Sequence, residues 1–124
     1  MNHCLLIRHG ETQPAIISAE DVERLTELVH KIEATQGLIS DWSLPGGHAE
    51  AAAYEVARTT CRRAERTVVR LIESDGQVDP NVLAYLNRLS DLIWLFGRLL
   101  EVEAGVDSRL RDDQYRGARW SRAW

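Results

Sequence analysis

Apolar residues recur at three- and four-residue steps through most of this chain, and this spacing constrains the fold more than any other feature. Such a repeat places apolar side chains on one face of an α-helix, whereas a half-buried strand alternates every second residue. It occurs in three stretches, carried by Val22, Leu25, Leu28, Val29 and Ile32; by Ala51, Ala52, Ala53, Val56, Ala57, Ala64, Val68, Leu71 and Ile72; and by Val82, Leu83, Leu86, Leu89, Ile93, Phe96, Leu99 and Leu100. The chain is therefore predicted to be all-α, a bundle of three antiparallel helices. The second stripe begins with alanines, so we expect another helix to approach closely there.

Capping residues, glycines and prolines set the predicted helix boundaries. Ser18 and Asp21 have the spacing of a capping box, and Asp79 precedes a proline suited to the first helical position. Glycines follow the predicted ends. We expect helices over about 19–36, 48–75 and 80–104.

Length, charge and cysteine content narrow the class of protein. The 124 residues suit a single helical domain over 1–124, with partly ordered tails at 1–17 and 106–124. A formal net charge of −4 argues against general nucleic-acid binding, which uses a basic face. The chain has neither a long apolar run nor a secretory signal pattern, so we expect no membrane association. Cys4 and Cys61 lack metal or redox spacing, and we interpret them as reduced thiols of a cytoplasmic protein.

The segment LIRHGET near the N-terminus resembles the start of a histidine-phosphatase domain, in which the histidine accepts a phosphoryl group. That chemistry needs a parallel sheet that brings a second histidine and further arginines to the first. Here only Cys4–Ile7 is a candidate strand, and three helices follow directly. We therefore interpret His9 as a surface histidine and reject the phosphatase function.

The segment ARTTCRRAER, residues 57–66, carries the most informative charges. Arg58, Arg62 and Arg66 lie four residues apart, so on a helix they form a ladder with Glu65 near its edge. A polyphosphate can neutralise three stacked guanidiniums, because each binds phosphate oxygens bidentately. Carboxylates from another helix or subunit can do the same. Periodicity alone favours this structural salt-bridge explanation but leaves the phosphate site open.

The third predicted helix places an amide and a carboxylate beside its apolar stripe. Asn87 and Asp91 are one turn apart and share a face. Buried polar groups need hydrogen-bond partners, and we expect arginines of the preceding, antiparallel helix to supply them. An internal polar lock and a ligand-binding role both remain open.

Taken together, these segments are similar to the C-terminal part of the PduO-type ATP:cob(I)alamin adenosyltransferases. The match runs from about Ile17 to Gly105, through ISAEDVERL, LPGG, ARTTCRRAER and VDPNVLAYLNRLSDLIWLFGRL, in the same order and with the same spacings. Members of that family are helical bundles that form trimers with the active site between subunits. They transfer the 5′-deoxyadenosyl group of ATP to the reduced cobalt of a corrinoid and release triphosphate.

The resemblance implies roles for individual residues. Arg58 and Arg62 would serve the nucleotide site as its catalytic residues, and Asn87 would bond to the nucleotide. The residues that would hold the site's geometry from nearby are Glu65, Arg63, Arg66 and Asp91. Trp42 stands where the family has a phenylalanine under the corrin ring; a loop tryptophan folded onto the core is the alternative.

The resemblance implies ATP and cobalamin as ligands. It does not decide whether Mg²⁺ also binds, because the family's Thr- and Gly-rich phosphate loop has no close match here. We assign no metal-binding residue. We therefore expect activity to depend on a neighbouring subunit or partner that supplies this loop. The bundle is expected to be completed by oligomerisation, with a trimer implied by the family.

Two other classes of function remain alternatives to an adenosyltransferase. One is a non-catalytic corrinoid- or nucleotide-binding protein that stores, delivers or senses the cofactor. The other is a structural helical oligomer that keeps the arginines only for salt bridges.

Overall fold

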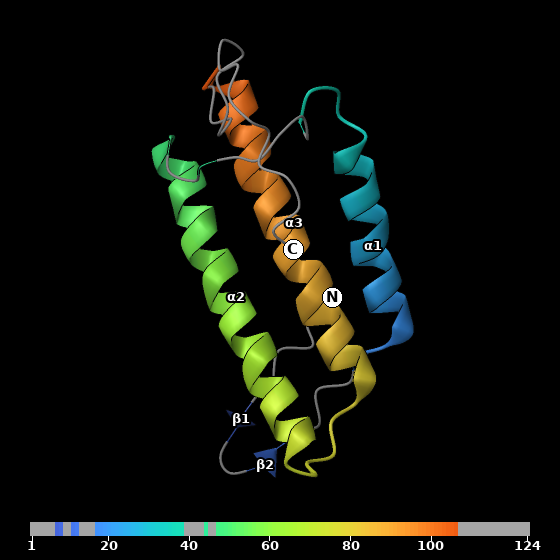
Figure 1. Cartoon of the computed structure of the whole chain (residues 1–124). Coiled ribbons are helices and arrows are strands. Elements are labelled where there is room, and N and C mark those ends of the chain that lie inside the picture. The colour runs from blue at the N-terminus through green and yellow to red at the C-terminus, as the bar shows by residue number, and fades with distance from the viewer. Residues whose placement is uncertain (1–6, 9–10, 13–16, 39–43, 45–46, 107–124) are drawn as a thin grey trace, which may run out of the picture.

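The computed structural model describes residues 7–8, 11–12, 17–38, 44 and 47–106, and three long helices make up most of this part (Figure 1). They are α1 (Ala19–Glu33), α2 (Ala49–Glu73) and α3 (Pro80–Glu103). Successive helices run in opposite directions, and α3 lies between α1 and α2. The prediction of an all-α fold is confirmed. Within the described part, α1 and α2 each pack on α3 and not on each other.

A short antiparallel strand pair precedes the helices. β1 (Ile7–Arg8) pairs with β2 (Glu11–Thr12), with Ile7 opposite Thr12 and Arg8 opposite Glu11. The candidate strand at 4–7 is thus seen only from Ile7 onward, since residues 1–6 lie outside the described part. His9 and Cys4 also lie outside it. No parallel strand pair occurs among the described residues, which agrees with the rejection of a phosphatase.

Local capping chemistry explains where the helices begin. The Ser18 hydroxyl accepts a hydrogen bond from the Asp21 N–H at 3.2 Å, and the Asp21 carboxylate accepts one from the Ser18 N–H at 2.9 Å. At α3, the Asp79 carboxylate accepts a hydrogen bond from the Asn81 N–H at 2.9 Å. Both caps satisfy N–H groups that have no partner inside the helix.

The helix ends differ slightly from the prediction. α1 stops at Glu33, three residues before the predicted end at 36, because Thr35 turns back to bond the Ile32 carbonyl at 2.9 Å. Gly37 then adopts a φ of 81°, a conformation that favours glycine. The ends of α2 and α3 fall within two residues of the expected positions.

The hydrophobic core lies between α1 and α3. Its most buried members are Leu25, Val29, Leu38, Leu92 and Leu95. The predicted stripe of α3 is only half-buried, because this helix has neighbours on two sides and distributes its buried residues between them. Prediction of a single buried face was therefore wrong for α3.

α3 approaches the alanine stripe of α2 closely at Ala51, where a Cβ on Gly97 would lie 3.6 Å from the Ala51 carbonyl oxygen, but not along the later alanines. Ala51 and Cys61 are the buried residues of α2, whereas Ala53, Ala57 and Ala64 are exposed. On the same exposed side Val56 keeps 67% of its surface accessible and Leu71 keeps 49%. α2 thus has a second, uncovered apolar face, which we call the outer α2 stripe (Ala53, Val56, Ala57, Ala64 and Leu71).

In the part of the chain that the structure describes, no helix combines the length and apolarity needed to cross a bilayer.

Candidate functional site

The candidate site lies along the seam between α2 and α3, and short-range contacts fix the register of the two helices. The Cys61 thiol donates a hydrogen bond to the Leu86 carbonyl at 3.3 Å. Nearer the start of α2, the rings of Tyr54 and Phe96 meet at a centroid distance of 5.9 Å. These contacts place the middle of α2, which carries the arginines, beside the first half of α3, which carries Asn87.

A three-residue network joins the two helices at the predicted cluster. Arg62 donates from Nη1 to Glu65 Oε2 at 2.6 Å, and the Asn87 amide nitrogen donates to Glu65 Oε1 at 3.0 Å. The Glu65 side chain is only 13% exposed, whereas that of Arg62 is 42% exposed. Glu65 therefore links a surface guanidinium to a side chain of the neighbouring helix. The structure brings together three of the predicted site residues, Arg62, Glu65 and Asn87.

Arg58 is held by a different carboxylate, one turn earlier on the same helix. Its Nε donates to Glu55 Oε2 at 2.8 Å and its Nη2 donates to Glu55 Oε1 at 2.5 Å. Both side chains are partly buried, with 32% of Arg58 and 22% of Glu55 exposed. Two of the three ladder arginines are therefore neutralised within α2 itself, which is how guanidiniums of like charge can stack there.

Of the other predicted residues that the structure describes, Asp91, Arg63 and Arg66 do not join this network. Asp91 pairs with Arg88 of its own helix at 3.2 Å and not with an arginine of α2, so the predicted partner was wrong. Arg88 lies three residues before Asp91 on α3, so it reaches the Asp91 carboxylate without crossing to α2. Arg66 is exposed, and no described carboxylate lies within ion-pair distance of it. Trp42 lies outside the described residues.

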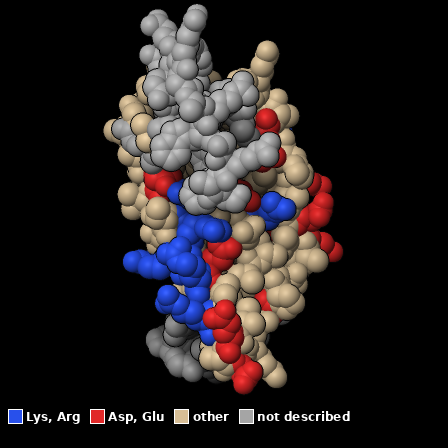
Figure 2. Space-filling view, in the orientation of Figure 1, with Lys and Arg blue, Asp and Glu red and all other residues tan. Residues whose placement is uncertain are grey.

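The arginines of α2 form a basic band on a protein of negative net charge. Figure 2 shows Lys and Arg side chains gathered along the α2 side of the visible face, with acidic side chains both beside them and toward the α1 side. The members of the band on α2 are Arg58, Arg62, Arg63, Arg66 and Arg70. Arg63, Arg66 and Arg70 have no carboxylate within ion-pair distance among the described residues. Arg66, which follows Arg62 by one helical turn, therefore offers a free guanidinium group to an anion bound at Arg62.

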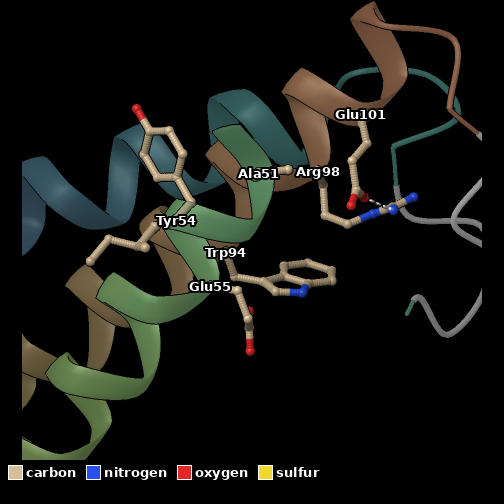
Figure 3. Close-up of a pocket in the computed structure, with 8 residues that line it drawn as sticks. Ala51, Tyr54, Glu55, Trp94, Arg98 and Glu101 are labelled. Atoms are coloured by element: carbon tan, nitrogen blue, oxygen red, sulfur yellow. Dashed lines mark hydrogen bonds and ion pairs between the residues drawn. The ribbon is translucent and has the colours of Figure 1, made fainter. Parts of the chain in front are cut away.

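A shallow hollow adjoins the band between the start of α2 and the end of α3 (Figure 3). Within it Arg98 and Glu101 form a buried ion pair, with 6% and 3% of each residue exposed. The Glu55 carboxylate points away from this pair. The hollow is lined by Ala51, Tyr54, Glu55, Ile93, Trp94, Gly97, Arg98 and Glu101.

Among the described residues, the surroundings shift the pKa values of two side chains. The hydrogen bonds to Glu55 raise the pKa of the Arg58 guanidinium above its usual value, which outweighs the opposite effect of burial. Burial raises the pKa of the Cys61 thiol, and the Glu65 charge adds to this effect while Arg62 opposes it. Arg58 is thus a permanent cation, and Cys61 is a protonated, unpaired thiol at neutral pH. No group of three His, Cys, Asp or Glu side chains suited to a metal occurs among the described residues.

Sequence reasoning missed Glu55, Arg98 and Glu101. A signal for each was present, because Glu55 precedes Arg58 by three residues and Glu101 follows Arg98 by three. On a helix such pairs are neighbours. The second pair also interrupts an apolar helix with opposite charges, which itself indicates a buried ion pair.

We compared the chain with known protein families and solved structures. The family model described as cobalamin adenosyltransferase matches residues 2–100. This chain belongs to the cobalamin adenosyltransferase family. The predicted resemblance is thereby confirmed.

Relatives in the cobalamin adenosyltransferase family come from bacteria and from mammals. The corrinoid adenosyltransferase of Bacillus subtilis is 36% identical over 90 residues, which cover 73% of this chain and 46% of that protein. The cobalamin adenosyltransferase of Cupriavidus metallidurans is 34% identical over 90 residues, which cover 73% of this chain and 48% of that protein. The chain therefore spans about half the length of these cobalamin adenosyltransferases.

Solved structures of the family share the fold. A variant of the PduO-type ATP:corrinoid adenosyltransferase from Lactobacillus reuteri, complexed with cobalamin and ATP, has a TM-score of 0.66 and 31% identity. That match covers 82% of this chain and 53% of the other. A second variant of the same enzyme, with the same ligands, gives a TM-score of 0.70 at 28% identity, over 82% of this chain and 54% of the other.

Proposed function

We propose that this chain takes part in transferring the 5′-deoxyadenosyl group of ATP to cob(I)alamin or a related corrinoid. The observation that carries the proposal is the Arg62–Glu65–Asn87 network across the seam of α2 and α3. It holds a half-exposed guanidinium and an amide together, and these are groups that suit a nucleotide with its phosphates. Membership of the family and relatives solved with cobalamin and ATP support the same function.

The described residues fit a polyphosphate, because hydrogen-bond donors remain after the internal pairs are made. Arg62 uses Nη1 for Glu65, which leaves Nε and Nη2, and Arg66 has no described carboxylate within ion-pair distance. In this proposal Arg58 and Arg62 bind phosphate oxygens and stabilise the charge that develops on the leaving triphosphate. Asn87 bonds the nucleotide, and Arg66 adds positive charge nearby. We assign Mg²⁺ to no described residue.

The corrinoid side of the reaction depends on residues outside the described part. We propose that Trp42 packs against the corrin ring and excludes water from the cobalt, with the bound corrinoid supplying the nucleophilic metal. Asp91, paired with Arg88 at the surface of α3, keeps only a supporting role in the shape of the site.

We further propose that the protein is a cytoplasmic homo-oligomer, a trimer by resemblance to its family. The outer α2 stripe supports association, because an exposed apolar face on a helix is typical of an interface. A neighbouring subunit placed there would lie next to the basic band of the same helix.

A second candidate function rests on a specific observation. Arg58 and Arg62 are already paired with Glu55 and Glu65, so two of the three ladder arginines are neutralised without any ligand. This favours a structural helical oligomer, or a corrinoid-binding protein without the chemistry.

Calorimetric titration of the purified protein with ATP and, separately, with cobalamin distinguishes these functions. Binding of both ligands supports the adenosyltransferase. Binding of cobalamin alone favours a corrinoid-binding protein. Binding of neither leaves the structural function and overturns the proposal.

A further inference from the structure

Of the three described helices, only α2 starts without a side-chain cap. Ser18 and Asp79 cap α1 and α3, whereas His48, the N-cap residue of α2, makes no capping hydrogen bond. The His48 Nδ1 is also buried without a hydrogen-bond partner among the described residues. An uncapped helix start and an unpaired buried nitrogen both destabilise a fold. Local hydrogen bonds therefore do not explain where α2 begins, and its packing against α3 sets this position.

Gly47, directly before His48, lies against the end of α3. A Cβ on Gly47 would lie 2.8 Å from the Val106 Cγ1, which is too close for two carbon atoms in a packed protein. The φ of Gly47 lies outside the left-handed region, so the neighbouring side chain, and not the backbone conformation, requires glycine here. The role of Gly47 can therefore be tested by changing its neighbour.

Val106 is itself held in place by the end of α3. Its N–H donates to the Glu101 carbonyl at 2.9 Å, and Gly105 before it has a φ of 68°, as in a Schellman cap. The Glu101 side chain is buried and paired with Arg98 at the edge of the hollow (Figure 3). Val106 therefore has little freedom to move away from Gly47.

The contact between Gly47 and Val106 determines where the loop before α2 leaves the bundle. Trp42, which we propose to pack against the corrin ring, precedes Gly47 by five residues, so the chain keeps it within about 18 Å of Gly47. Between them, the apolar Leu44 keeps 58% of its surface accessible. Exposed apolar side chains near a hollow suit a ligand with a large apolar face, such as a corrin ring.

We propose that Gly47 is a positioning residue for the corrinoid: its contact with Val106 sets the start of α2 against α3 and thereby the place of the loop that carries Trp42. This inference rests on the proposed function, because it assumes that the loop meets a corrinoid. The nucleotide network is a separate part of the site, since Arg62 lies about 20 Å further along α2 than His48. Gly47 therefore affects binding of the corrinoid and not of ATP.

The test measures the affinities for cobalamin and for ATP by calorimetry in the wild-type protein and in Gly47→Ala. The added methyl group pushes the start of α2 away from α3, so we expect cobalamin binding to weaken about tenfold while ATP binding stays unchanged. Gly76→Ala is the matched control, because it crowds the opposite end of α2, where a Cβ would lie 2.6 Å from the Leu71 carbonyl oxygen. It should lower stability without changing the affinity for cobalamin.

A second substitution separates positioning from a general effect on the fold. Val106→Ala removes the Cγ1 that the new methyl group would meet, so in that background Gly47→Ala should cause much less loss of cobalamin affinity. The free energy of unfolding should show the same rescue without any ligand. If Gly47→Ala does not fold, Val106→Ile takes its place, because it crowds the same contact from the α3 side and should also weaken cobalamin binding.

The outcomes separate this inference from the proposed function. If the wild-type protein binds no cobalamin, the proposed function fails and this inference fails with it. If the wild-type protein binds cobalamin and Gly47→Ala binds it equally well, or loses ATP affinity to the same extent, only the positioning role is overturned. An equal loss from Gly47→Ala with and without the Val106 side chain also contradicts it, because the effect then does not act through this contact.

Discussion

Glu65 accepts hydrogen bonds from side chains of two helices, and the geometry of the candidate site depends on it more than on any arginine. One oxygen faces Arg62 of α2 and the other faces Asn87 of α3, with 13% of the carboxylate side chain exposed. The sequence identified all three residues, because each lies on a predictable helix face. It did not show that a carboxylate joins the arginine to the amide, since that contact depends on the register between two helices.

Replacement of Glu65 by alanine is expected to destabilise the fold. The change removes two hydrogen bonds and leaves the Asn87 amide without its partner, a loss of about 1–3 kcal/mol. The free energy of unfolding by urea measures this. Asp91→Ala is the control, because that carboxylate makes an exposed pair with Arg88 and its loss should cost less than about 1 kcal/mol. Equal losses in the two variants would contradict the bridging role.

Cys61 is a second single residue that allows a prediction, here on how the stability of the fold depends on pH. Because its pKa is raised in the folded state, the unfolded chain loses the thiol proton first as pH rises. Stability should therefore decline as pH rises above the ordinary thiol pKa of about 8.5. A ¹³Cβ titration in a Cys4→Ser background measures the pKa directly. We expect a midpoint above the ordinary value and a lower midpoint when Glu65→Gln removes the nearby charge; a midpoint at or below the ordinary value would refute this account.

At the scale of elements, sequence periodicity predicted which residues are helical but not which face of each helix packs against a neighbouring helix. The capping box at Ser18 and the Asp79 cap fixed two starts because they depend only on local hydrogen bonds. The buried faces of α2 and α3 were misassigned because they depend on which helix lies in the centre. Apolar residues on α3 contact two neighbouring helices, and on α2 Ala51 faces α3 while Ala53, Ala57 and Ala64 face outward.

Gly97 tests the packing of α3 on α2. A Cβ at this position would lie 3.5 Å from the Tyr54 Cβ and 3.6 Å from the Ala51 carbonyl oxygen, which are ordinary contact distances. Gly97→Ala should therefore stabilise the protein by about 0.5–1 kcal/mol, because alanine favours a helix interior. Thermal denaturation measures the change.

Gly76→Ala is the contrasting variant. A Cβ there would lie 2.6 Å from the Leu71 carbonyl oxygen, so the backbone must shift and stability should fall. Destabilisation by Gly97→Ala would show that α2 and α3 lie closer than described.

At the scale of the whole molecule, the described helices form a layer with α3 in the centre, and the outer α2 stripe is left uncovered. Covering this stripe in an oligomer would remove apolar surface from water and bring another chain to the basic band. The proposed trimer and the proposed nucleotide site therefore involve the same helix. The sequence predicted association and a close approach of another helix at the alanines of α2, and within the chain that approach occurs at Ala51.

Val56→Glu should prevent this association. Val56 is 67% exposed in the single chain, so a charge there is tolerated by the fold but not by an apolar interface. Sedimentation velocity at micromolar concentration is expected to show a trimer for the wild-type protein and a monomer for the variant. Val102→Glu, at an exposed valine of α3, is the matched control and should remain trimeric. A compact, stable wild-type monomer would rule out the proposed assembly.

The measurement that tests the central claim most directly is calorimetric titration of ATP into Arg62→Ala and Arg70→Ala. Both variants lose one positive charge from α2, but only Arg62 belongs to the network with Glu65 and Asn87. We predict that Arg62→Ala abolishes detectable ATP binding and that Arg70→Ala binds as the wild-type protein does. Equal affinity in the two variants would contradict a nucleotide site at this network.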